Sequence, residues 1–598
     1  MNPAGFITML LAETGAAPER LLQHLCATQQ AFSCVPDSAV DELAAQLGKT
    51  PAHIQGVIDF YRFLHRHPRG DFDILFSDNI TDQMLGSRRL FDRFCRTLGV
   101  EPGIPRADGR VSVDLTSCTG LCDQGPALLV NGFAITGLNE AGLEQMVKNI
   151  EAGIELADWP ADWFVVKDNI RRSSLLLAND ITAGAAISLL LQQGGDSVLE
   201  RIKQSGLRGR GGAGFNTALK WQLCRDAPAD AHYVVCNADE GEPGTFKDRV
   251  LLNRYADTLF EGMTVCAGVV GARKGYLYLR GEYRYLLEAL EAVLQRRREQ
   301  NLLGDAIAGQ TGFDFDIDIH LGAGAYICGE ESALIESLEG RRGIPRKRPP
   351  FPVTNGLFDR PTVVNNVETF VAAAKITVSG ANWFRAVGTG QSPGTKLLSI
   401  SGDCARPGIY EYPFGVSVKQ VLDDCGAQQT QAVQVAGAAG ITLSPAAFER
   451  RIAFEDVATG GSFMVFNRQR DLLAMVQNFT DFFCHESCGF CTPCRVGGQL
   501  MKQLVDKVAG GHATVSDLAE MRHIGQVMQQ ASHCGLGVSA VNALFSTLDA
   551  FPEVYRRRLA HRGFEPAFDL EAALAQSRQI TGRDDPAAHI ADEAGGEP

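Results

Sequence analysis

The segment ESCGFCTPCR places three cysteines at intervals of three residues: Cys488, Cys491 and Cys494. This spacing lets one loop wrap three corners of a [4Fe–4S] cubane, while a fourth thiolate arrives from elsewhere in the chain. The downstream stretch SHCGLG supplies that fourth thiolate as Cys534. We therefore predict one [4Fe–4S] cluster held by these four cysteines.

Two other interpretations of the cysteines remain open at this point. Zinc usually takes paired C-x-x-C or Cys/His sets, so three thiols within seven residues fit a zinc site less well. The thiols could also be buried without any metal. Cys484, four residues before the first ligand, is expected to be a packed helical thiol.

A glycine-rich stretch, GLRGRGGAGFNTALKW, has G-x-G-x-x-G spacing at Gly209, Gly211 and Gly214. A dinucleotide-binding fingerprint should follow a strand directly, whereas the preceding VLERIKQSGLRGR has the pattern of a helix end. A flexible loop would have the same composition. Its backbone amides could still approach a phosphate or a flat ring, with Arg210 and Lys220 neutralising charge.

Two further segments place acidic side chains where ligands bind. VVCNADEGEPGTFKDR ends an expected strand with four polar residues: Asn237, Asp239, Glu240 and Glu242. Open α/β sheets bind ligands at such strand ends, although solvated acids are an alternative. GAGAYICGEESALIESLEGRRGIPRKRPPFP contains Glu330 and Glu331 and ends in five basic residues within eight. In an acidic chain, this basic cluster indicates either an anionic ligand or a solvated face.

The bulk composition excludes several classes of protein. The chain has 598 residues and a formal net charge of −14, which argues against a general nucleic-acid binder. Its apolar runs are shorter than the ~20 residues of a membrane span, and its start has no basic signal-like region. Sixteen cysteines without a secretory signal indicate a reducing compartment, so we expect a cytoplasmic protein.

Periodicity predicts an α/β multidomain chain. HYVVCNAD, KGYLYLR and FDFDIDIHLG alternate as strands with helices such as YLLEALEAVLQRRREQ, which is typical of a doubly wound sheet. The final stretch, GRDDPAAHIADEAGGEP, has the composition of a disordered segment. The expected divisions are a helical bundle at 1–70, an α/β unit at 71–155, a linker at 156–180, the doubly wound domain at 181–390, a β-based module at 391–470, a second helical bundle at 471–565 and a tail at 566–598.

Several of these segments together resemble the NADH-binding flavoprotein subunit of respiratory complex I and its relatives. The shared pieces are GLRGRGGAGF, CNADEGEPGTFKDR, GAGAYICGEESALIESLEG, PPFP, PTVVNNVETF, ESCGFCTPCR and CGLG. The resemblance implies a Rossmann-like FMN- and NAD-binding domain, a ubiquitin-like β module and a C-terminal helical bundle that carries the [4Fe–4S] cluster.

The resemblance also implies cofactor contacts. The expected FMN contacts are Gly209, Arg210, Gly211, Gly212, Lys220, Asn237, Asp239, Glu240, Tyr326, Gly329, Glu330, Val364, Asn365, Asn366 and Thr369. NAD(H) is expected to stack its adenine near Phe215 and Phe351, with Glu242 and Glu331 near the nicotinamide and ribose. Stacking of nicotinamide on flavin needs no catalytic acid or base. The family pattern R-x-K-P-P-F is R-K-R-P-P-F here, so Arg348 replaces a lysine.

The first 150 residues resemble the companion complex I subunit fused in front, with a helical bundle followed by a thioredoxin-like [2Fe–2S] domain. That family carries C-x4-C and a later C-x3-C. The second pair is present as Cys118 and Cys122, but Ser77 and Asp82 stand where the first pair belongs. A [2Fe–2S] centre needs four ligands, so we expect this cluster to be absent and the domain to serve in docking.

A fused chain with a degenerate N-terminal cluster site resembles the diaphorase flavoprotein subunits of soluble NAD-reducing [NiFe] hydrogenases. This implies an oxidoreductase that exchanges hydride between NAD(H) and FMN, then passes single electrons through the [4Fe–4S] cluster. The partners would be a small iron–sulfur diaphorase subunit and [NiFe] hydrogenase subunits in a hetero-oligomer. The alternatives are the NADH-handling subunit of a formate dehydrogenase or of complex I and, more remotely, a redox-inactive assembly scaffold.

Overall fold

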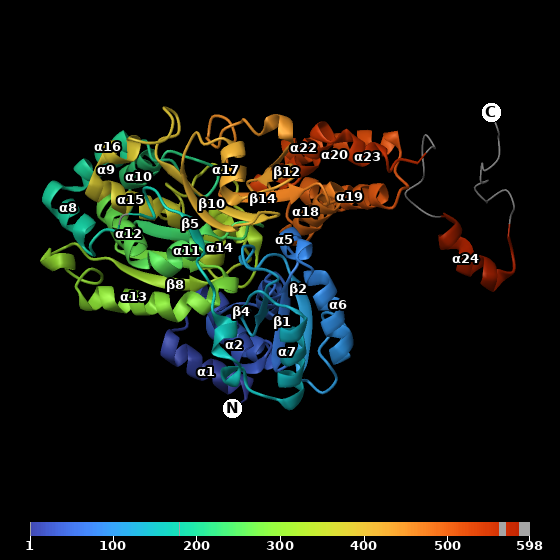
Figure 1. Ribbon diagram of the computed structural model, residues 1–598. Coiled ribbons are helices and arrows are strands. Elements are labelled where there is room, and N and C mark those ends of the chain that lie inside the picture. Colours follow the sequence, from blue (N-terminus) through green and yellow to red (C-terminus); the bar gives the residue numbers. More distant parts are fainter. Residues whose placement is uncertain (1, 179, 561–569, 585–598) are drawn as a thin grey trace.

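The protein is described by a computed structural model that covers residues 2–178, 180–560 and 570–584 (Figure 1). It contains three β-sheets with helices around and between them. This is the α/β multidomain architecture that the sequence predicted. Helix α24, Leu570–Thr581, is a described part of the expected tail, whereas most of the stretch predicted to be disordered lies outside the described residues.

The thioredoxin-like unit is built on a four-stranded sheet of order β2-β1-β3-β4. Strand β1 is parallel to β2 and antiparallel to β3. The strands are β1 Phe72–Ser77, β2 Val111–Thr116, β3 Leu128–Val130 and β4 Phe133–Ile135, and the helices are α5 Ile80–Met84, α6 Ser87–Leu98 and α7 Glu140–Ala152. The loop between β2 and β3 carries Cys118 and Cys122 and faces the central domain.

The central domain has a parallel sheet of order β8-β7-β6-β9. Its strands are β6 Tyr233–Ala238, β7 Lys274–Leu279, β8 Asp316–Leu321 and β9 Thr362–Asn366. Its helices are α8 Ala185–Gln193, α9 Gly195–Ser205, α10 Thr217–Asp226, α11 Lys247–Arg254, α12 Ala256–Val270, α13 Leu287–Glu299, α14 Glu331–Leu338, α15 Val367–Ser379 and α16 Ala381–Arg385. The apolar strands are buried because helices cover both faces, as parallel sheets require. The strand order reverses at β6, since β7 lies on one side of it and β9 on the other, which places a ligand crevice at the carboxyl ends of β6 and β9.

The N-terminal helices cover one face of this central sheet. They are α1 Pro3–Thr14, α2 Leu21–Phe32, α3 Asp37–Leu47 and α4 Pro51–Ile58. Their apolar residues share one buried core with Val235 of β6 and Leu334 of α14. The Tyr61 hydroxyl donates to Ser337 Oγ at 2.8 Å, which adds a buried polar contact. The first helices therefore pack as a layer of the central domain.

A six-stranded mixed sheet of order β13-β12-β14-β10-β11-β5 forms the β module. Its strands are β5 Ile170–Arg172, β10 Thr395–Gly402, β11 Gly408–Pro413, β12 Thr430–Val435, β13 Ile441–Leu443 and β14 Ser462–Asn467, with helix α17 at Val418–Cys425. Strand β5 comes from the stretch expected to be a linker and pairs in parallel with β11. Three residues without clear alternation give no strand signal, so the sequence did not indicate this pairing.

The C-terminal bundle projects beyond the β module in Figure 1. Its helices are α18 Leu472–Glu486, α19 Thr492–Ala509, α20 Val515–Ala531, α21 Gly535–Ser539, α22 Asn542–Ala550 and α23 Pro552–Arg556. Helix α18 packs on α19, and α19 packs on α20. Within the described part of the chain, no helix is long and apolar enough to cross a membrane.

Candidate functional site

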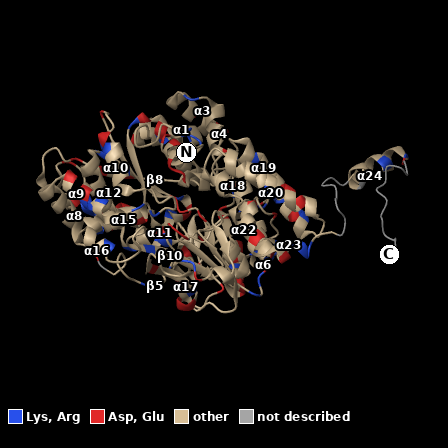
Figure 2. Cartoon of the chain, turned by 90° about the horizontal axis from the view of Figure 1, so that it is seen from above, with Lys and Arg blue, Asp and Glu red and all other residues tan. Residues whose placement is uncertain are grey.

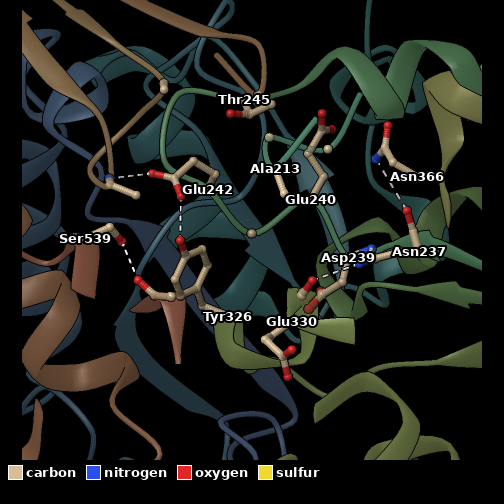
Figure 3. A pocket seen from close by; sticks show the side chains of 18 of the residues that line it. Ala213, Asn237, Asp239, Glu240, Glu242, Thr245, Tyr326, Glu330, Asn366 and Ser539 are labelled. Atoms are coloured by element: carbon tan, nitrogen blue, oxygen red, sulfur yellow. Dashed lines mark hydrogen bonds between the residues drawn. The ribbon is translucent and has the colours of Figure 1, made fainter. Parts of the chain in front are cut away.

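A cavity of about 520 Å³ lies at the carboxyl end of the central sheet (Figure 3). Asn237 of β6 and Asn366 of β9 are register partners there, so the two motifs that carry them meet. The cavity takes its walls from the central domain, the β module and the C-terminal bundle. The predicted site residues that line it are Gly211, Gly212, Asn237, Asp239, Glu240, Glu242, Tyr326, Gly329, Glu330 and Asn366.

The glycine loop presents bare backbone to this cavity. Gly212 has a φ of 130°, which L side chains rarely adopt, and a Cβ there would meet nothing within 4 Å. The loop closes through a hydrogen bond from the Gly209 amide to the Phe215 carbonyl at 2.8 Å. Asn216 then caps α10 through the Leu219 amide. The loop follows helix α9 rather than a strand, which is consistent with an atypical phosphate or ring cradle.

Glu240 is an integral part of the cavity wall. Its carboxylate accepts hydrogen bonds from the Asp248 amide at 2.8 Å and the Arg249 amide at 3.2 Å, at the start of α11. The Tyr283 hydroxyl donates a third bond at 2.8 Å. Burial raises the pKa of Glu240, and the neighbouring Asp248 raises it further. These three donors hold the side chain in place.

Glu242 connects two walls of the cavity. Its Oε2 accepts from the Tyr326 hydroxyl at 2.5 Å, and its Oε1 accepts from the Ala439 amide of the β module at 2.9 Å. Burial raises the pKa of Glu242 to about 7, while both hydrogen bonds act to lower it. The carboxyl group therefore changes charge near neutral pH.

The cavity carries unused polar groups, as a site for a polar cofactor would. Asp239 Oδ2 and Thr245 Oγ1 are buried and have no hydrogen-bond partner among the described residues. Buried polar atoms are normally paired, so a ligand that pairs them would offset a cost of about 1–3 kcal/mol each. With the bare glycine backbone opposite, these residues fit FMN, which has both donors and acceptors on a flat ring.

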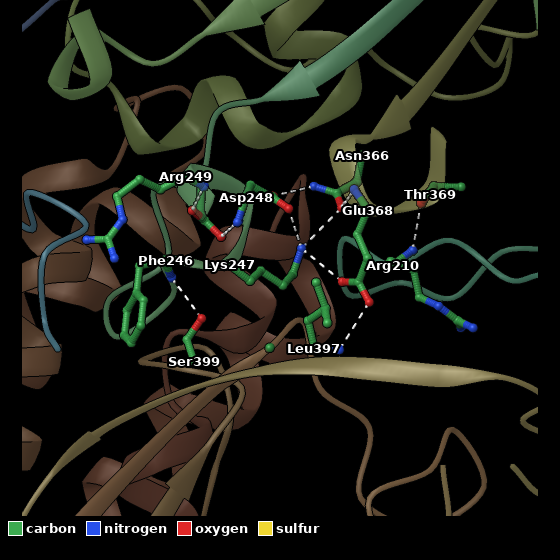
Figure 4. Close-up of polar contacts among 12 residues, drawn as sticks. Arg210, Phe246, Lys247, Asp248, Arg249, Asn366, Glu368, Thr369, Leu397 and Ser399 are labelled. Atoms are coloured by element: carbon green, nitrogen blue, oxygen red, sulfur yellow. Dashed lines mark hydrogen bonds and ion pairs between the residues drawn. The ribbon is translucent and has the colours of Figure 1, made fainter. Parts of the chain in front are cut away.

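A buried charge network joins the cavity floor to the β module (Figure 4). Lys247 Nζ lies 2.6 Å from Asp248 Oδ1 and 3.1 Å from Glu368 Oε2. Lys396 of β10 binds the same Glu368 carboxylate. All four side chains are almost fully buried, so each charge depends on the others for compensation. The network fixes strand β10 against the start of α15.

The four predicted cluster cysteines surround a second, small cavity: Cys488, Cys491, Cys494 and Cys534. Cys491 stands at the N-cap of α19. The His533 amide points at Cys491 Sγ at 3.5 Å. Burial raises the pKa of Cys534 to about 11, so loading metal at this thiol must displace a proton.

The arrangement of the four thiols does not match a site for a single ion. In the described ranges, no three His, Cys, Asp or Glu side chains are arranged to hold one metal ion. A zinc site would bring its sulfurs to about 2.3 Å from one centre. Four thiols around a common space fit a larger cluster better than zinc. This cavity shares Ile327 and Leu536 with the larger one, so the same two side chains line both.

Three family models match the chain in succession. Residues 7–151 match the thioredoxin-like [2Fe–2S] ferredoxin family, and residues 202–375 match the Nuo51 FMN-binding domain. Residues 474–558 match the iron–sulfur binding region of NADH-ubiquinone oxidoreductase-F. The FMN-binding match spans most of the residues that line the large cavity, and the iron–sulfur match spans the four cysteines.

A curated relative matches nearly the whole chain. It is the NAD-reducing hydrogenase HoxS subunit alpha of Cupriavidus necator, which is 43% identical over 95% of this chain and 97% of its own length. This chain belongs to the alpha-subunit family of NAD-reducing hydrogenases. A solved NAD+-reducing [NiFe]-hydrogenase in the H2-reduced state contains a chain with the same fold, at a TM-score of 0.89 and 44% identity, covering 96% of this chain and 99% of that one.

Other relatives match a smaller share of the chain. The NADP-reducing hydrogenase subunit HndC of Solidesulfovibrio fructosivorans is 39% identical over 60% of this chain and 75% of its own length. The match over nearly the whole chain therefore confirms the resemblance to a fused hydrogenase alpha subunit rather than to the complex I flavoprotein alone. The family models also confirm an FMN-binding domain and a [4Fe–4S] binding region.

In this hydrogenase alpha-subunit chain, Arg210 is not among the residues that line the cavity. It is 1% exposed, and its guanidinium lies over the rings of Phe384, Phe414 and Phe454. From the same loop, Gly211, Gly212 and Ala213 line the cavity. The Arg210 side chain packs the glycine loop against aromatic side chains, two of them from the β module, and its contact with FMN stays a prediction.

Lys220 and Glu331 form an ion pair beside the cavity. Lys220 Nζ lies 3.0 Å from Glu331 Oε2 and donates to the Val364 carbonyl at the same distance. Arg348, the replacement for the family lysine, also approaches Glu331, at 3.5 Å. Glu331 directly follows Glu330, which lines the cavity, so these charges lie next to the cavity without lining it.

The remaining predicted contacts divide into buried supports and exposed rings. Asn365 accepts a hydrogen bond from Trp221 Nε1 at 2.9 Å, and Thr369 accepts one from the Arg210 amide at 3.0 Å, so both support the loop. Phe215 and Phe351 are about half exposed, at 47% and 52%. Exposed rings of this kind could stack on a planar ligand.

The N-terminal cysteine pair has a polar neighbourhood of its own. Cys118 Sγ and Cys122 Sγ are 3.5 Å apart, and Asn79 Nδ2 donates to Cys122 Sγ at 2.8 Å. Ser77 Oγ donates to Asp82 Oδ2 at 2.7 Å, so the two residues at the first-pair positions bind each other. The absence of a [2Fe–2S] centre stays a prediction.

Sequence reasoning missed several cavity residues. Lys247 and Asp248 stand in the quoted FKDR motif but were not singled out. Thr459 and Gly460 come from the β module and Ser539 from the cluster bundle. The FKDR pair could have been found from its motif, whereas nothing local in the sequence signals that the other three reach this cavity.

Proposed function

We propose that this chain is the NAD(H)-handling diaphorase subunit of an NAD-reducing hydrogenase. It would exchange hydride reversibly between NAD(H) and FMN, and pass single electrons through the [4Fe–4S] cluster to partner subunits that oxidise or produce hydrogen. The observation that carries this proposal is a wall shared by two cavities. Ile327 and Leu536 line both the large cavity of about 520 Å³, here called the flavin-sized cavity, and the small cavity surrounded by the four cysteines, here called the cysteine cavity.

The chain's own residues would do three things. The backbone of Gly211 and Gly212 would cradle FMN, while Asn237 and Asp239 would pair with polar atoms of its ring. Bound FMN supplies the chemistry that joins a two-electron hydride to one-electron carriers. Glu242 and Tyr326, fixed to each other, would orient the nicotinamide. Orientation of the nicotinamide on the flavin and exclusion of water would account for the rate of hydride transfer, because this step needs no acid or base.

NAD(H) would enter past the exposed aromatic side chains. Phe215 and Phe351 would stack on the adenine, since both rings are about half exposed. Glu331, paired with Lys220, would lie near the ribose. Arg348 keeps a positive charge where the family usually has lysine, but its forked geometry differs from a point-like ammonium.

The partners would be a small iron–sulfur diaphorase subunit and [NiFe] hydrogenase subunits, in keeping with the relative that covers nearly the whole chain. No role in nucleic-acid binding is proposed, since the chain is acidic and Figure 2 shows acidic and basic residues interspersed over the molecule. We propose a cytoplasmic location, because none of the sixteen cysteines, all of which lie in the described residues, takes part in a disulfide, as in a reducing compartment.

The deciding experiment is anaerobic co-purification with analysis of metals and flavin. We expect bound FMN, NADH-dependent dye reduction by the chain, and H2-dependent NAD+ reduction only when nickel–iron subunits are present. A molybdenum or tungsten partner would instead indicate a formate dehydrogenase. A colourless, iron-free preparation that is indifferent to NADH would indicate a redox-inactive scaffold.

A further inference from the structure

Glu486 joins the cluster loop to two other parts of the molecule. It is the last residue of α18 and stands two positions before Cys488. Its Oε1 accepts a hydrogen bond from Ser117 Oγ of the thioredoxin-like unit at 2.5 Å. Its Oε2 accepts one from the Tyr326 amide of the central domain at 3.0 Å. The two oxygens of one carboxylate thus hold two different units.

Tyr326 extends this connection into the flavin-sized cavity. Its hydroxyl donates to Glu242, which in turn accepts from Ala439 of the β module. Its ring packs edge-on against Phe482 of α18, with centroids 4.9 Å apart. Tyr326 is therefore held at its amide by Glu486, at its ring by α18 and at its hydroxyl by Glu242.

The residue that follows Tyr326 is part of the shared wall. Ile327 is 4% exposed and lines both the large cavity and the cysteine cavity. A shift of the Tyr326 amide would move Ile327, because consecutive Cα atoms are separated by a fixed distance. The hydrogen bond from the Tyr326 amide to Glu486 therefore helps to hold Ile327 in place between the two cavities.

The thioredoxin-like unit supports this junction from a second position. Arg280 Nη2 donates to the Cys118 carbonyl at 2.7 Å, and its Nη1 donates to the Glu240 carbonyl at 2.5 Å. The loop that begins at Ser117 thus contacts the large cavity's wall as well as the cluster loop. These contacts involve the backbone and a hydroxyl, so they do not require metal at Cys118.

We propose that Glu486 is a positioning residue for electron transfer between the flavin-sized cavity and the [4Fe–4S] site, with Ser117 of the thioredoxin-like unit as its brace. This inference rests on the proposed function. It gives the N-terminal unit a task that needs no [2Fe–2S] centre. Glu486 contacts no substrate; it acts through Tyr326 and Ile327.

The test compares two rates after the full chain, loaded with FMN and iron, is mixed with NADH. Flavin bleaching by stopped-flow absorbance reports the hydride step, and freeze-quench paramagnetic resonance reports reduction of the cluster. In Glu486→Ala we expect cluster reduction to slow several-fold while the rate of flavin bleaching stays unchanged. Glu486→Gln should restore the rate, because its amide can accept from Tyr326 and donate to Ser117.

Ser117→Ala removes only the brace and is expected to slow cluster reduction less than Glu486→Ala does. Glu520→Ala, an exposed glutamate of the same bundle, is the matched control and should behave as wild type. If Glu486→Ala holds its full iron content and reduces the cluster at the wild-type rate, the positioning role is wrong. If Ser117→Ala reduces the cluster at the wild-type rate, Ser117 does not brace Glu486. Equal slowing of flavin bleaching and of cluster reduction in Glu486→Ala would indicate that Glu486 has only a structural role. Failure of the wild type to bleach with NADH would instead overturn the proposed function.

Discussion

At the scale of single residues, the charge of the Glu242 carboxyl group is expected to control which redox state of the nicotinamide binds in the large cavity. Its pKa of about 7 means that it is neutral in mild acid and charged in mild base. The nicotinamide ring is positive in NAD+ and neutral in NADH. An ionised Glu242 would therefore favour NAD+ over NADH, and protonation would remove that preference.

We expect the dissociation constant of NAD+ to fall as pH rises from 6 to 8, while that of NADH changes little. The change should be roughly tenfold, which corresponds to about 1.4 kcal/mol of charge–charge attraction. Glu242→Gln should abolish this pH dependence, and Glu520→Gln, on the exposed surface of the bundle, should keep it. Quenching of flavin fluorescence measures the constant for NAD+, and the fluorescence of NADH itself, with protein that lacks FMN and so cannot be reduced, measures the constant for NADH. An unchanged pH profile in Glu242→Gln would contradict the assignment.

Cys491 provides the second test at this scale. Cys491→Ala leaves three thiols around the small cavity, so the cluster's paramagnetic signal should disappear and iron content should fall. FMN should remain bound, because no cysteine lines the large cavity. Cys484→Ala is the control: burial raises the pKa of this thiol to about 11, and it lies outside the cysteine cavity. Full iron content in Cys491→Ala would refute the ligand set.

At the scale of elements, local patterns predicted the strands and the motifs at their ends, but not which distant elements meet them. Strand β6 and the acidic residues after it follow from a short apolar run and its polar end. The direction of the Arg210 side chain could not be inferred, since its aromatic partners Phe384, Phe414 and Phe454 lie far along the chain. Strand β5 was missed for the same reason: its pairing with β11 is non-local.

The segment from β1 to α5 provides a prediction at this scale. Ser77 ends β1, and Asp82 lies within α5, each in contact with the other. We expect about four iron atoms per flavin in the wild type, because a single cubane holds four and two thiols are too few for a second centre. The double variant Ser77→Cys with Asp82→Cys should gain a [2Fe–2S] signal in paramagnetic resonance. Such a signal in the wild type would refute the prediction that this centre is absent.

At the scale of the whole molecule, the units are held together by contacts that do not depend on the connecting chain. Trp159 stacks on Phe72 of the thioredoxin-like unit, with centroids 5.6 Å apart, so the start of the connection belongs to that unit. Strand β5 belongs to the β module. Between them, Val165 is 55% exposed. A cut after Val165 would interrupt no helix or strand, although helices α1–α4 of the shorter piece share a buried core with the central domain.

The interface between the two pieces is buried and charged. Arg249 Nη1 pairs with Asp123 Oδ1 at 3.2 Å, and both side chains are at most 1% exposed. Breaking such a pair costs about 3–5 kcal/mol, because it leaves a buried charge uncompensated. Each piece alone should therefore be destabilised, whereas the two together should associate.

We accordingly expect residues 1–165 and 166–598, expressed as two chains, to co-purify. The pair should reduce dyes with NADH at a rate within about twofold of the intact chain, because the peptide connection between the pieces mainly raises their effective concentration. Asp123→Ala in the shorter piece should weaken association, while Glu140→Ala, on an exposed surface of that piece, should leave it unchanged. Size-exclusion chromatography with flavin absorbance measures association, and dye reduction measures function. If the pieces stay apart when mixed at micromolar concentration, the connection rather than the interface holds the molecule together.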